Sequence, residues 1–85
     1  MKSFTYVIKD KEGIHARPAG VIAAEAKKFT SSVIMKNKGK EADVTRLLRV
    51  MSLCVKSGEE VEIVVEGSDE EACAASMKKA FEENL

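Results

Sequence analysis

Histidine, proline and cysteine are scarce in this 85-residue chain, and the shortage excludes several kinds of site. The sequence has one histidine, one proline and two cysteines, Cys54 and Cys73, which lie far apart and form no Cys-x-x-Cys motif. Neither a zinc site nor a redox motif can be built from so few ligands, so we expect no metal and no cofactor. A disulfide between the two cysteines is possible, but a reducing compartment disfavours it.

Long apolar segments are also missing. No stretch approaches the roughly 20 apolar residues of a membrane-spanning helix, and the first residues lack the apolar centre of a signal peptide. We therefore expect a cytoplasmic protein without membrane insertion. A chain of 85 residues has room for one small domain, which we expect to span residues 1–85.

The net charge is zero, since 14 basic side chains balance 14 acidic ones. This balance, with only one tyrosine and three phenylalanines and no RNA-binding motif, argues against nucleic acid as a partner. The charges are nevertheless unevenly distributed along the chain. Residues 1–56 carry twelve basic and five acidic side chains, and residues 57–85 carry two basic and nine acidic ones. This asymmetry predicts an electrostatic dipole in the folded protein.

Hydrophobic periodicity predicts strands mixed with helices. The run from Glu60 to Glu66 alternates most clearly, with three aliphatic residues on one face and glutamates on the other. We predict strands over residues 3–8, 32–36, about 40–43 and 60–66, and helices over residues 16–29, 46–53 and 69–84. The order βαββαβα predicts an α+β fold, an antiparallel sheet with all helices on one face.

Two of the predicted helices carry candidate capping residues at their starts. Asp43 or Thr45 is available to cap the helix over residues 46–53. Ser68 and Glu71 fit a capping box ahead of the last helix, with the Ser68 hydroxyl bonding to the third amide and Glu71 reaching back. We therefore expect both helices to begin with side-chain caps.

The single histidine, His15, stands immediately before the first predicted helix, in the run Gly13-Ile14-His15-Ala16-Arg17-Pro18. A helix start offers unpartnered amides and the positive end of the helix dipole, and both favour an anion. The Arg17 guanidinium suits phosphate oxygens, and Pro18 fixes the entry of the chain into the helix. Positive surroundings would keep the imidazole neutral, as attack on phosphorus requires. The alternative is that His15 merely caps the helix or lies on the surface.

Two motifs in the sequence resemble those of one known family. The segment from Gly13 to Ala19 matches the active-site signature of the histidine-containing phosphocarrier (HPr) family of the bacterial sugar phosphotransferase system. The run Val50-Met51-Ser52-Leu53 matches the second signature of that family, and the resemblance covers the whole chain. It implies an open-faced β-sandwich, with a four-stranded antiparallel sheet covered on one face by three helices.

The resemblance also implies a phosphoryl carrier that is not itself an enzyme. His15 would accept a phosphoryl group from enzyme I on its Nδ1 nitrogen and pass it to the IIA domains of sugar permeases. Arg17 would stabilise the phosphate, and Ala16 and Pro18 would form the helix start that receives it. In the family the second helix docks both partners, and we expect the carrier to be a monomer. We assign to the docking surface the apolar residues Leu47, Leu48 and Met51 and a basic rim of Arg46 and Arg49.

Two positions depart from the family pattern. Arg46 stands where many family members carry a regulatory serine, and the nearest hydroxyl, that of Thr45, is displaced by one residue. Cys54 stands where the family usually has glycine, at a helix end where a positive φ suits glycine best. We interpret Cys54 as a small packing residue, with a reactive thiol as the alternative.

An alternative interpretation exists both for the docking residues and for the phosphocarrier function. Leu47 and Leu48 could belong to the core rather than to a partner surface. The chain could also be a regulatory binding module of the same family, which reports its phosphorylation state to a transcription factor or metabolic enzyme without supporting sugar uptake. The departures at Arg46 and Cys54 favour this second function.

Overall fold

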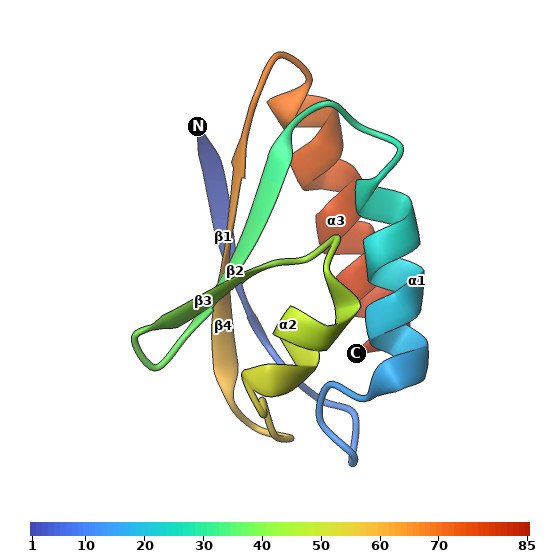
Figure 1. Cartoon of the computed structure of the whole chain (residues 1–85), viewed down its shortest axis with the longest axis vertical. Coiled ribbons are helices and arrows are strands. Elements are labelled where there is room, and N and C mark those ends of the chain that lie inside the picture. The colour runs from blue at the N-terminus through green and yellow to red at the C-terminus, as the bar shows by residue number, and fades with distance from the viewer.

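A computed structural model describes all residues from 1 to 85 and shows one sheet with helices on a single face (Figure 1). The strands are β1 (Lys2–Val7), β2 (Ser32–Asn37), β3 (Lys40–Asp43) and β4 (Glu60–Glu66), and the helices are α1 (Ala16–Ala26), α2 (Leu47–Ser52) and α3 (Glu70–Asn84). All neighbouring strands are antiparallel, in the order β1-β4-β2-β3. The predicted fold class and element order are confirmed. None of the helices is both long and apolar enough to cross a membrane.

The central strand β4 presents its aliphatic side chains to the helices. Val61, Ile63 and Val65 are at most 1% exposed, as the alternation in the sequence predicts. Phe81 of α3 is fully buried against this layer and meets Phe4 edge to face, with ring centroids 6.0 Å apart. The core therefore lies between the sheet and α3, and it fixes the frame that carries the two shorter helices.

The first helix ends earlier than its periodicity predicts. Its apolar face is buried as expected, but α1 stops at Ala26 and the chain to Phe29 makes tight turns. The N–H of Phe29 bonds to the carbonyl of Ala26 at 3.2 Å, a three-residue step that closes the helix. The predicted end at Phe29 is therefore three residues too late.

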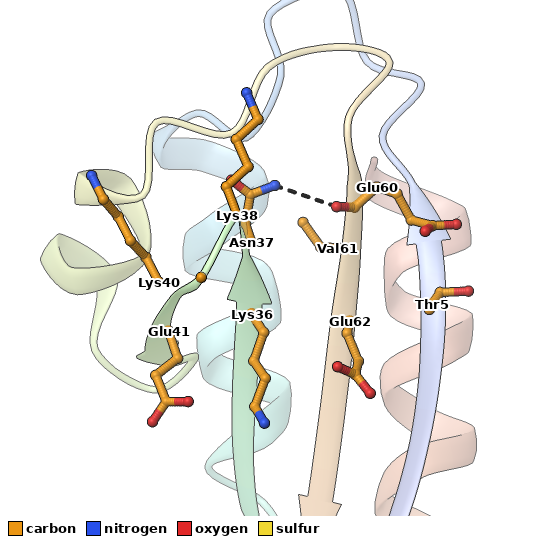
Figure 2. A pocket seen from close by; sticks show the side chains of 10 residues that line it. Thr5, Lys36, Asn37, Lys38, Lys40, Glu41, Glu60, Val61 and Glu62 are labelled. Carbon is orange, nitrogen blue, oxygen red and sulfur yellow. Dashed lines mark hydrogen bonds between the residues drawn. The ribbon is translucent and has the colours of Figure 1, made fainter.

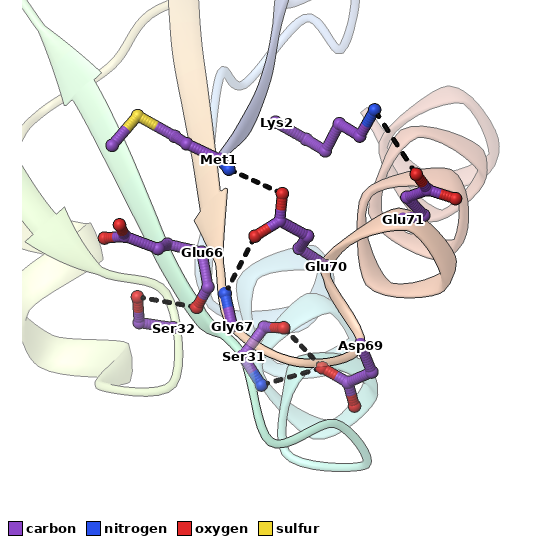
Figure 3. A network of polar contacts seen from close by, with 9 residues as sticks. All are labelled: Met1, Lys2, Ser31, Ser32, Glu66, Gly67, Asp69, Glu70 and Glu71. Atoms are coloured by element: carbon purple, nitrogen blue, oxygen red, sulfur yellow. Dashed lines mark hydrogen bonds and ion pairs between the residues drawn. The ribbon is translucent and has the colours of Figure 1, made fainter.

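Asp69, just before α3, ties that helix to the chain leaving α1 (Figure 3). Its Oδ1 accepts a hydrogen bond from the backbone N–H of Ser31 at 2.9 Å and another from the Ser31 hydroxyl. Its Oδ2 accepts one from the N–H of Thr30 at 2.9 Å. One carboxylate thus satisfies two backbone amides of a loop that lies 38 or more residues away in the sequence.

The predicted capping box at α3 is wrong. Glu70, rather than Glu71, reaches back, and its Oε1 accepts a hydrogen bond from the N–H of Gly67 at 3.2 Å while its Oε2 pairs with the amino group of Met1 at 2.5 Å (Figure 3). The Ser68 hydroxyl makes no cap and lies 3.1 Å from the hydroxyl of Thr30. The Ser68 hydroxyl thus has a distant partner, while the local contact back to Gly67 comes from Glu70 instead of Glu71.

Acid is expected to weaken the fold partly through Asp69. Its hydrogen bonds, first of all the one from the Ser31 hydroxyl, hold the pKa of Asp69 below its ordinary value. A lowered pKa in the folded state stabilises the fold above the unfolded-state pKa, about 3.9, and this contribution is lost as pH falls through the folded-state value. Urea unfolding of Asp69→Asn should therefore show a lower midpoint at neutral pH and a flatter decline below about pH 4. Glu71→Gln, at an exposed carboxylate, is the matched control, and an identical acid profile in both variants would contradict the assignment.

Candidate functional site

His15 is the residue that precedes α1, and its side chain does not cap the helix. Its backbone is extended, with φ −112° and ψ 177°, and its carbonyl accepts the first helical bond, from the N–H of Ala19 at 3.1 Å. The side chain makes no capping hydrogen bond and remains 35% exposed. The reading in which His15 serves as a helix cap is therefore excluded, and its imidazole is left available for chemistry.

The start of α1 leaves two amides unused. The N–H groups of Ala16 and Arg17 donate to no group in the chain, and Pro18, in the first turn, has no N–H to offer. Pro18 is buried and anchors this turn, as its position in the sequence predicts. Two backbone donors next to His15 therefore remain free for an anion.

The loop before His15 is held by distant backbone. The N–H groups of Lys9 and Asp10 bond to the backbone oxygen of Leu85 at 2.7 and 2.8 Å, and the N–H of Ile14 bonds to the carbonyl of Val55 at 3.1 Å. Between these anchors the N–H of Gly13 closes a turn onto the carbonyl of Asp10 at 3.0 Å. The end of α3 and the segment after α2 thus fix where His15 lies.

Gly13 is required by this loop for two reasons, and alanine should not replace it. Its φ is +71°, and a Cβ added there would lie 2.4 Å from the carbonyl oxygen of Val55. We expect Gly13→Ala to lower the free energy of unfolding by about 2 kcal/mol or more and to move His15, as measured by urea unfolding and amide chemical shifts. Gly58→Ala is the control, because Gly58 has φ +88° but nothing within 4 Å of the added Cβ. Equal losses of unfolding free energy in the two variants would show that the positive φ alone, and not the contact with Val55, requires glycine at position 13.

Two carboxylates face His15, so its surroundings are not simply positive as predicted. The Nε2 atom lies 3.4 Å from Oδ2 of Asp10 and 3.4 Å from Oε2 of Glu12. The N–H of Glu12 donates to the other oxygen of Asp10 at 2.9 Å, and this bond, with smaller contributions from His15, lowers the pKa of Asp10. Nδ1 of His15 makes no hydrogen bond within the chain. The two ring nitrogens therefore have different environments.

Asp10 and Glu12 were not among the site residues predicted from the sequence. They precede His15 by five and three residues, and the turn at Gly13 brings them back beside the ring. The three donor atoms lie within 4.8 Å of one another, the only such grouping of metal-type ligands in the chain, but they are exposed or half-buried and nothing else at the site indicates an ion. The spacing of the carboxylates was visible in the sequence, but the direction of the loop was not.

The three arginines assigned to the site are free to meet a partner. Arg17, Arg46 and Arg49 are exposed and form no ion pair with a carboxylate of the chain. Guanidinium groups without an internal partner can bind phosphate or acidic side chains without first breaking a contact. The predicted positive charge therefore lies on these unpaired side chains, while the charged groups within 3.4 Å of the imidazole are the carboxylates of Asp10 and Glu12.

The second helix exposes part of its apolar surface. Leu48 is 83% exposed and Leu47 is 36% exposed, whereas Val50 is buried and Met51 is half-buried against the core. The core alternative is therefore wrong for both Leu47 and Leu48, while Met51 contributes only a partial surface. The β1–α1 loop and α2 lie at the same end of the molecule, and α2 packs against α1 (Figure 1). Arg46, Leu47, Leu48 and Arg49 line a shallow hollow of about 310 Å³ there.

The predicted caps of α2 are absent. Arg46 occupies the capping position, and its side chain makes no capping hydrogen bond. Asp43 instead accepts two hydrogen bonds from Thr45, from its N–H at 2.9 Å and from its hydroxyl at 2.6 Å. The Thr45 hydroxyl is therefore engaged within its own turn.

Cys54 keeps the backbone that glycine would favour. Its φ is +53°, in the left-handed region, and its side chain is exposed, so the interpretation as a packing residue is wrong. Cys73 does pack in the core, where burial, and to a smaller degree the charge of Asp69, raise the pKa of its thiol. The structure thus separates one surface thiol near the end of α2 from one inert core thiol.

A second hollow, of about 530 Å³, lies on the open face of the sheet near the β2–β3 hairpin (Figure 2). Its side chains carry mixed charge, and Glu62 stands opposite both Thr5 and Lys36 in the strand register. The Asn37 side chain donates to the carbonyl of Glu60 at 3.3 Å. The hollow holds no histidine, cysteine or serine, and its lysines are matched by glutamates. It offers no nucleophile of the kind that His15 provides.

Known proteins share both the sequence and the fold. The family model described as PTS HPr component phosphorylation site matches residues 2–83. The phosphocarrier protein HPr of Mycoplasma genitalium is 40% identical over 85 residues, which are 99% of this chain and 97% of that protein. A solved histidine-containing phosphocarrier protein of Mycoplasma is 33% identical with a TM-score of 0.94, over 96% of this chain and 93% of that one. The chain belongs to the HPr family. It is a phosphocarrier protein of the phosphotransferase system.

A regulatory relative has the same fold. A structure of Crh, the catabolite repression HPr of Bacillus subtilis, has a TM-score of 0.79 at 31% identity over 94% of this chain and 92% of that one. That protein is described as an intertwined dimer with a swapped domain. Both carriers and a catabolite-repression protein thus occur among the structures that this chain resembles.

Proposed function

We propose that His15 accepts a phosphoryl group from phosphorylated enzyme I and passes it to the IIA domains of sugar permeases. The observation that carries the proposal is the position of the ring. His15 precedes α1 beside the unpartnered amides of Ala16 and Arg17, with Nε2 facing carboxylates and Nδ1 free of internal hydrogen bonds. Membership of the HPr family indicates that the group transferred to this histidine is a phosphoryl group.

The chemistry uses the Nδ1 lone pair. It attacks the phosphorus of the donor, an N–P bond forms as the donor's own bond to phosphorus breaks, and the proton on Nε2 stays in place. The transferred oxygens then accept hydrogen bonds from the amides of Ala16 and Arg17 and from the Arg17 guanidinium. All these groups are exposed, so they hold the phosphoryl group without enclosing it. Weak stabilisation suits a carrier, because tight binding of the phosphorylated state would block onward transfer.

Labelled phosphoenolpyruvate and enzyme I test the acceptance step. The chain should become labelled by a phosphoryl group that is lost in acid and on heating but survives base, as expected of a phosphohistidine. An acid-stable label would instead indicate a hydroxyl acceptor and would contradict the proposal.

We propose that α2 supplies the docking surface for both partners, with Leu48 at its centre and Arg46 and Arg49 on its rim. Leu48 is the most exposed large apolar residue of the chain, and the two arginines beside it have no internal partner. The arginines would steer acidic partner surfaces and raise the association rate more than the final affinity.

Truncating Leu48 should weaken partner binding without affecting the fold. We expect Leu48→Ala to raise the Kd for enzyme I about tenfold, which is about 1.4 kcal/mol, measured by titration calorimetry. Val7→Ala is the matched control, because Val7 is an aliphatic residue that is 44% exposed and lies on β1. If both variants bind as tightly as the parent chain, α2 is not the docking surface.

The regulatory module remains the second candidate function, and the likeness to Crh is the observation that favours it. Arg46 has no hydroxyl group, so we propose that no serine or threonine kinase acts on this chain at that position. Complementation of a strain lacking its HPr separates the two functions, because a pure regulator would leave sugar uptake unrestored.

We also propose that residues 1–85 act as one domain and as a monomer in the cytoplasm. Enzyme I and the IIA domains need the same end of the molecule in turn, which a single copy with an open α2 surface provides. Analytical ultracentrifugation tests this, and a stable dimer at micromolar concentration would contradict it.

A further inference from the structure

Asp10 is the side chain that the fold holds most firmly against the functional histidine. Its backbone N–H bonds to Leu85 at 2.8 Å, and its carbonyl accepts the N–H of Gly13 at 3.0 Å. Its Oδ1 accepts the N–H of Glu12 at 2.9 Å, which leaves Oδ2 directed at His15 Nε2, 3.4 Å away. Backbone contacts thus fix the carboxylate before any partner arrives.

We propose that Asp10 is a positioning residue that keeps the proton of His15 on Nε2, with Glu12 as a more exposed assistant. Glu12 lies at the same distance from Nε2, 3.4 Å, but its side chain is 72% exposed against 29% for Asp10. A carboxylate attracts a ring N–H and repels a ring lone pair, so two of them beside Nε2 favour the tautomer that carries the proton there. The lone pair is then on Nδ1, which has no partner in the chain. A carboxylate fixing the tautomer of a working histidine is a recurring device in proteins.

The inference rests on the proposed function for its effect on transfer. When Nδ1 bonds to phosphorus and the donor's bond breaks, the ring keeps its Nε2 proton and gains positive charge. The Asp10 carboxylate stabilises that charge, and no proton has to leave or arrive during the step. The hydrogen bond, long in the free chain, is expected to shorten as the charge develops. In onward transfer the ring departs as the same neutral tautomer from which it began.

The test combines a spectroscopic readout with a rate. In the isolated chain, at a pH where the ring is neutral, the nitrogen chemical shifts of His15 should show Nε2 protonated and Nδ1 bare. Asp10→Asn should move these shifts toward a mixture of both tautomers and slow phosphoryl transfer from enzyme I about tenfold, and Glu12→Gln should have a smaller effect on both. Glu71→Gln, at an exposed carboxylate on α3 that pairs only with Lys2, is the control and should change neither.

Failure of the role proposed for Asp10 can be distinguished from failure of the proposed function. If Asp10→Asn leaves the tautomer unchanged, or if it slows transfer only while the amide shifts of the whole loop move, Asp10 is not a positioning residue and the proposal fails. If the parent chain accepts no phosphoryl group at all, the proposed function fails. The nitrogen shifts of the isolated chain still decide the role of Asp10 in that case, because they require no enzyme I.

Discussion

Replacing His15 by alanine should abolish phosphoryl acceptance from enzyme I and leave the fold intact. The chain has a single histidine, and its side chain is 35% exposed and makes no structural cap, so little stability depends on it. His15 is the only imidazole of the chain, and the amides of Ala16 and Arg17 beside it have no partner. Incubation with labelled phosphoenolpyruvate and enzyme I measures the effect, and we expect a loss to background.

Two controls distinguish loss of the phosphoryl acceptor from loss of the fold. The free energy of unfolding of His15→Ala, measured with urea, should stay within about 0.5 kcal/mol of that of the parent chain, as for other surface substitutions. Val7→Ala, on β1, should be labelled at the parental rate. A variant without His15 that still accepts a label of the same acid lability would show that the acceptor lies elsewhere.

Phe81→Ala should have the opposite effect. It should greatly lower the free energy of unfolding while leaving the phosphoryl-accepting histidine in place. Phe81 is fully buried and meets both Phe4 and Tyr6 edge to face, with centroids 6.0 and 5.8 Å away. Truncating a buried phenylalanine costs about 3–5 kcal/mol, from lost burial and from the cavity that remains. A small domain has a total stability of about 5–15 kcal/mol, so this variant should be close to unfolding at 25 °C.

Chemical unfolding followed by circular dichroism measures this loss. Phe81→Leu is the matched variant, because it keeps much of the apolar volume and should lose considerably less. At a temperature where Phe81→Ala is still folded, it should accept the phosphoryl group normally, since Phe81 lies in the core and not at the start of α1. A loss below about 1 kcal/mol would mean that the sheet and α3 are not held together through this residue.

A secondary-structure element could be predicted from the sequence where only one of its faces is buried. Val61, Ile63 and Val65 alternate with glutamates because β4 is buried on one side only, and they are buried as predicted. The caps failed for a different reason. Ser68 fitted a local motif, but its hydroxyl lies 3.1 Å from the hydroxyl of Thr30, in another part of the chain. At α2 the competing contact is local, since Asp43 bonds to Thr45 instead of to the helix. A capping motif therefore predicts a cap only where its side chains have no other partner within reach.

The same distinction applies to the functional site: its local features could be predicted, and the features set by distant residues could not. The place of His15 before a helix is a local property, and the sequence predicted it. The carboxylates beside it could not be predicted, because their position depends on where Leu85 and Val55 hold the loop. The exposure of Leu48 was likewise undecided until the short α2 was seen to bury only Val50 completely.

The charges around His15 differ from those predicted from the sequence. The sequence predicted positive charge around His15, whereas Asp10 and Glu12 lie on one side of the ring and the free amides lie at the helix start. A ring between donors for phosphate and acceptors for its own proton is suited to reversible transfer. Arg46, just before α2, and Arg49, on α2, would then act on the partner rather than on the ring.

A timed relay tests the central claim, that His15 carries a phosphoryl group between two partners. The chain is labelled with enzyme I and radioactive phosphoenolpyruvate, the phosphoenolpyruvate is removed, and a IIA domain from the same organism is added. We predict that the label leaves the chain as it appears on the IIA domain, and that His15→Ala supports neither step. Label that remains on the chain after IIA is added, or that reaches IIA equally well through His15→Ala, would contradict the account.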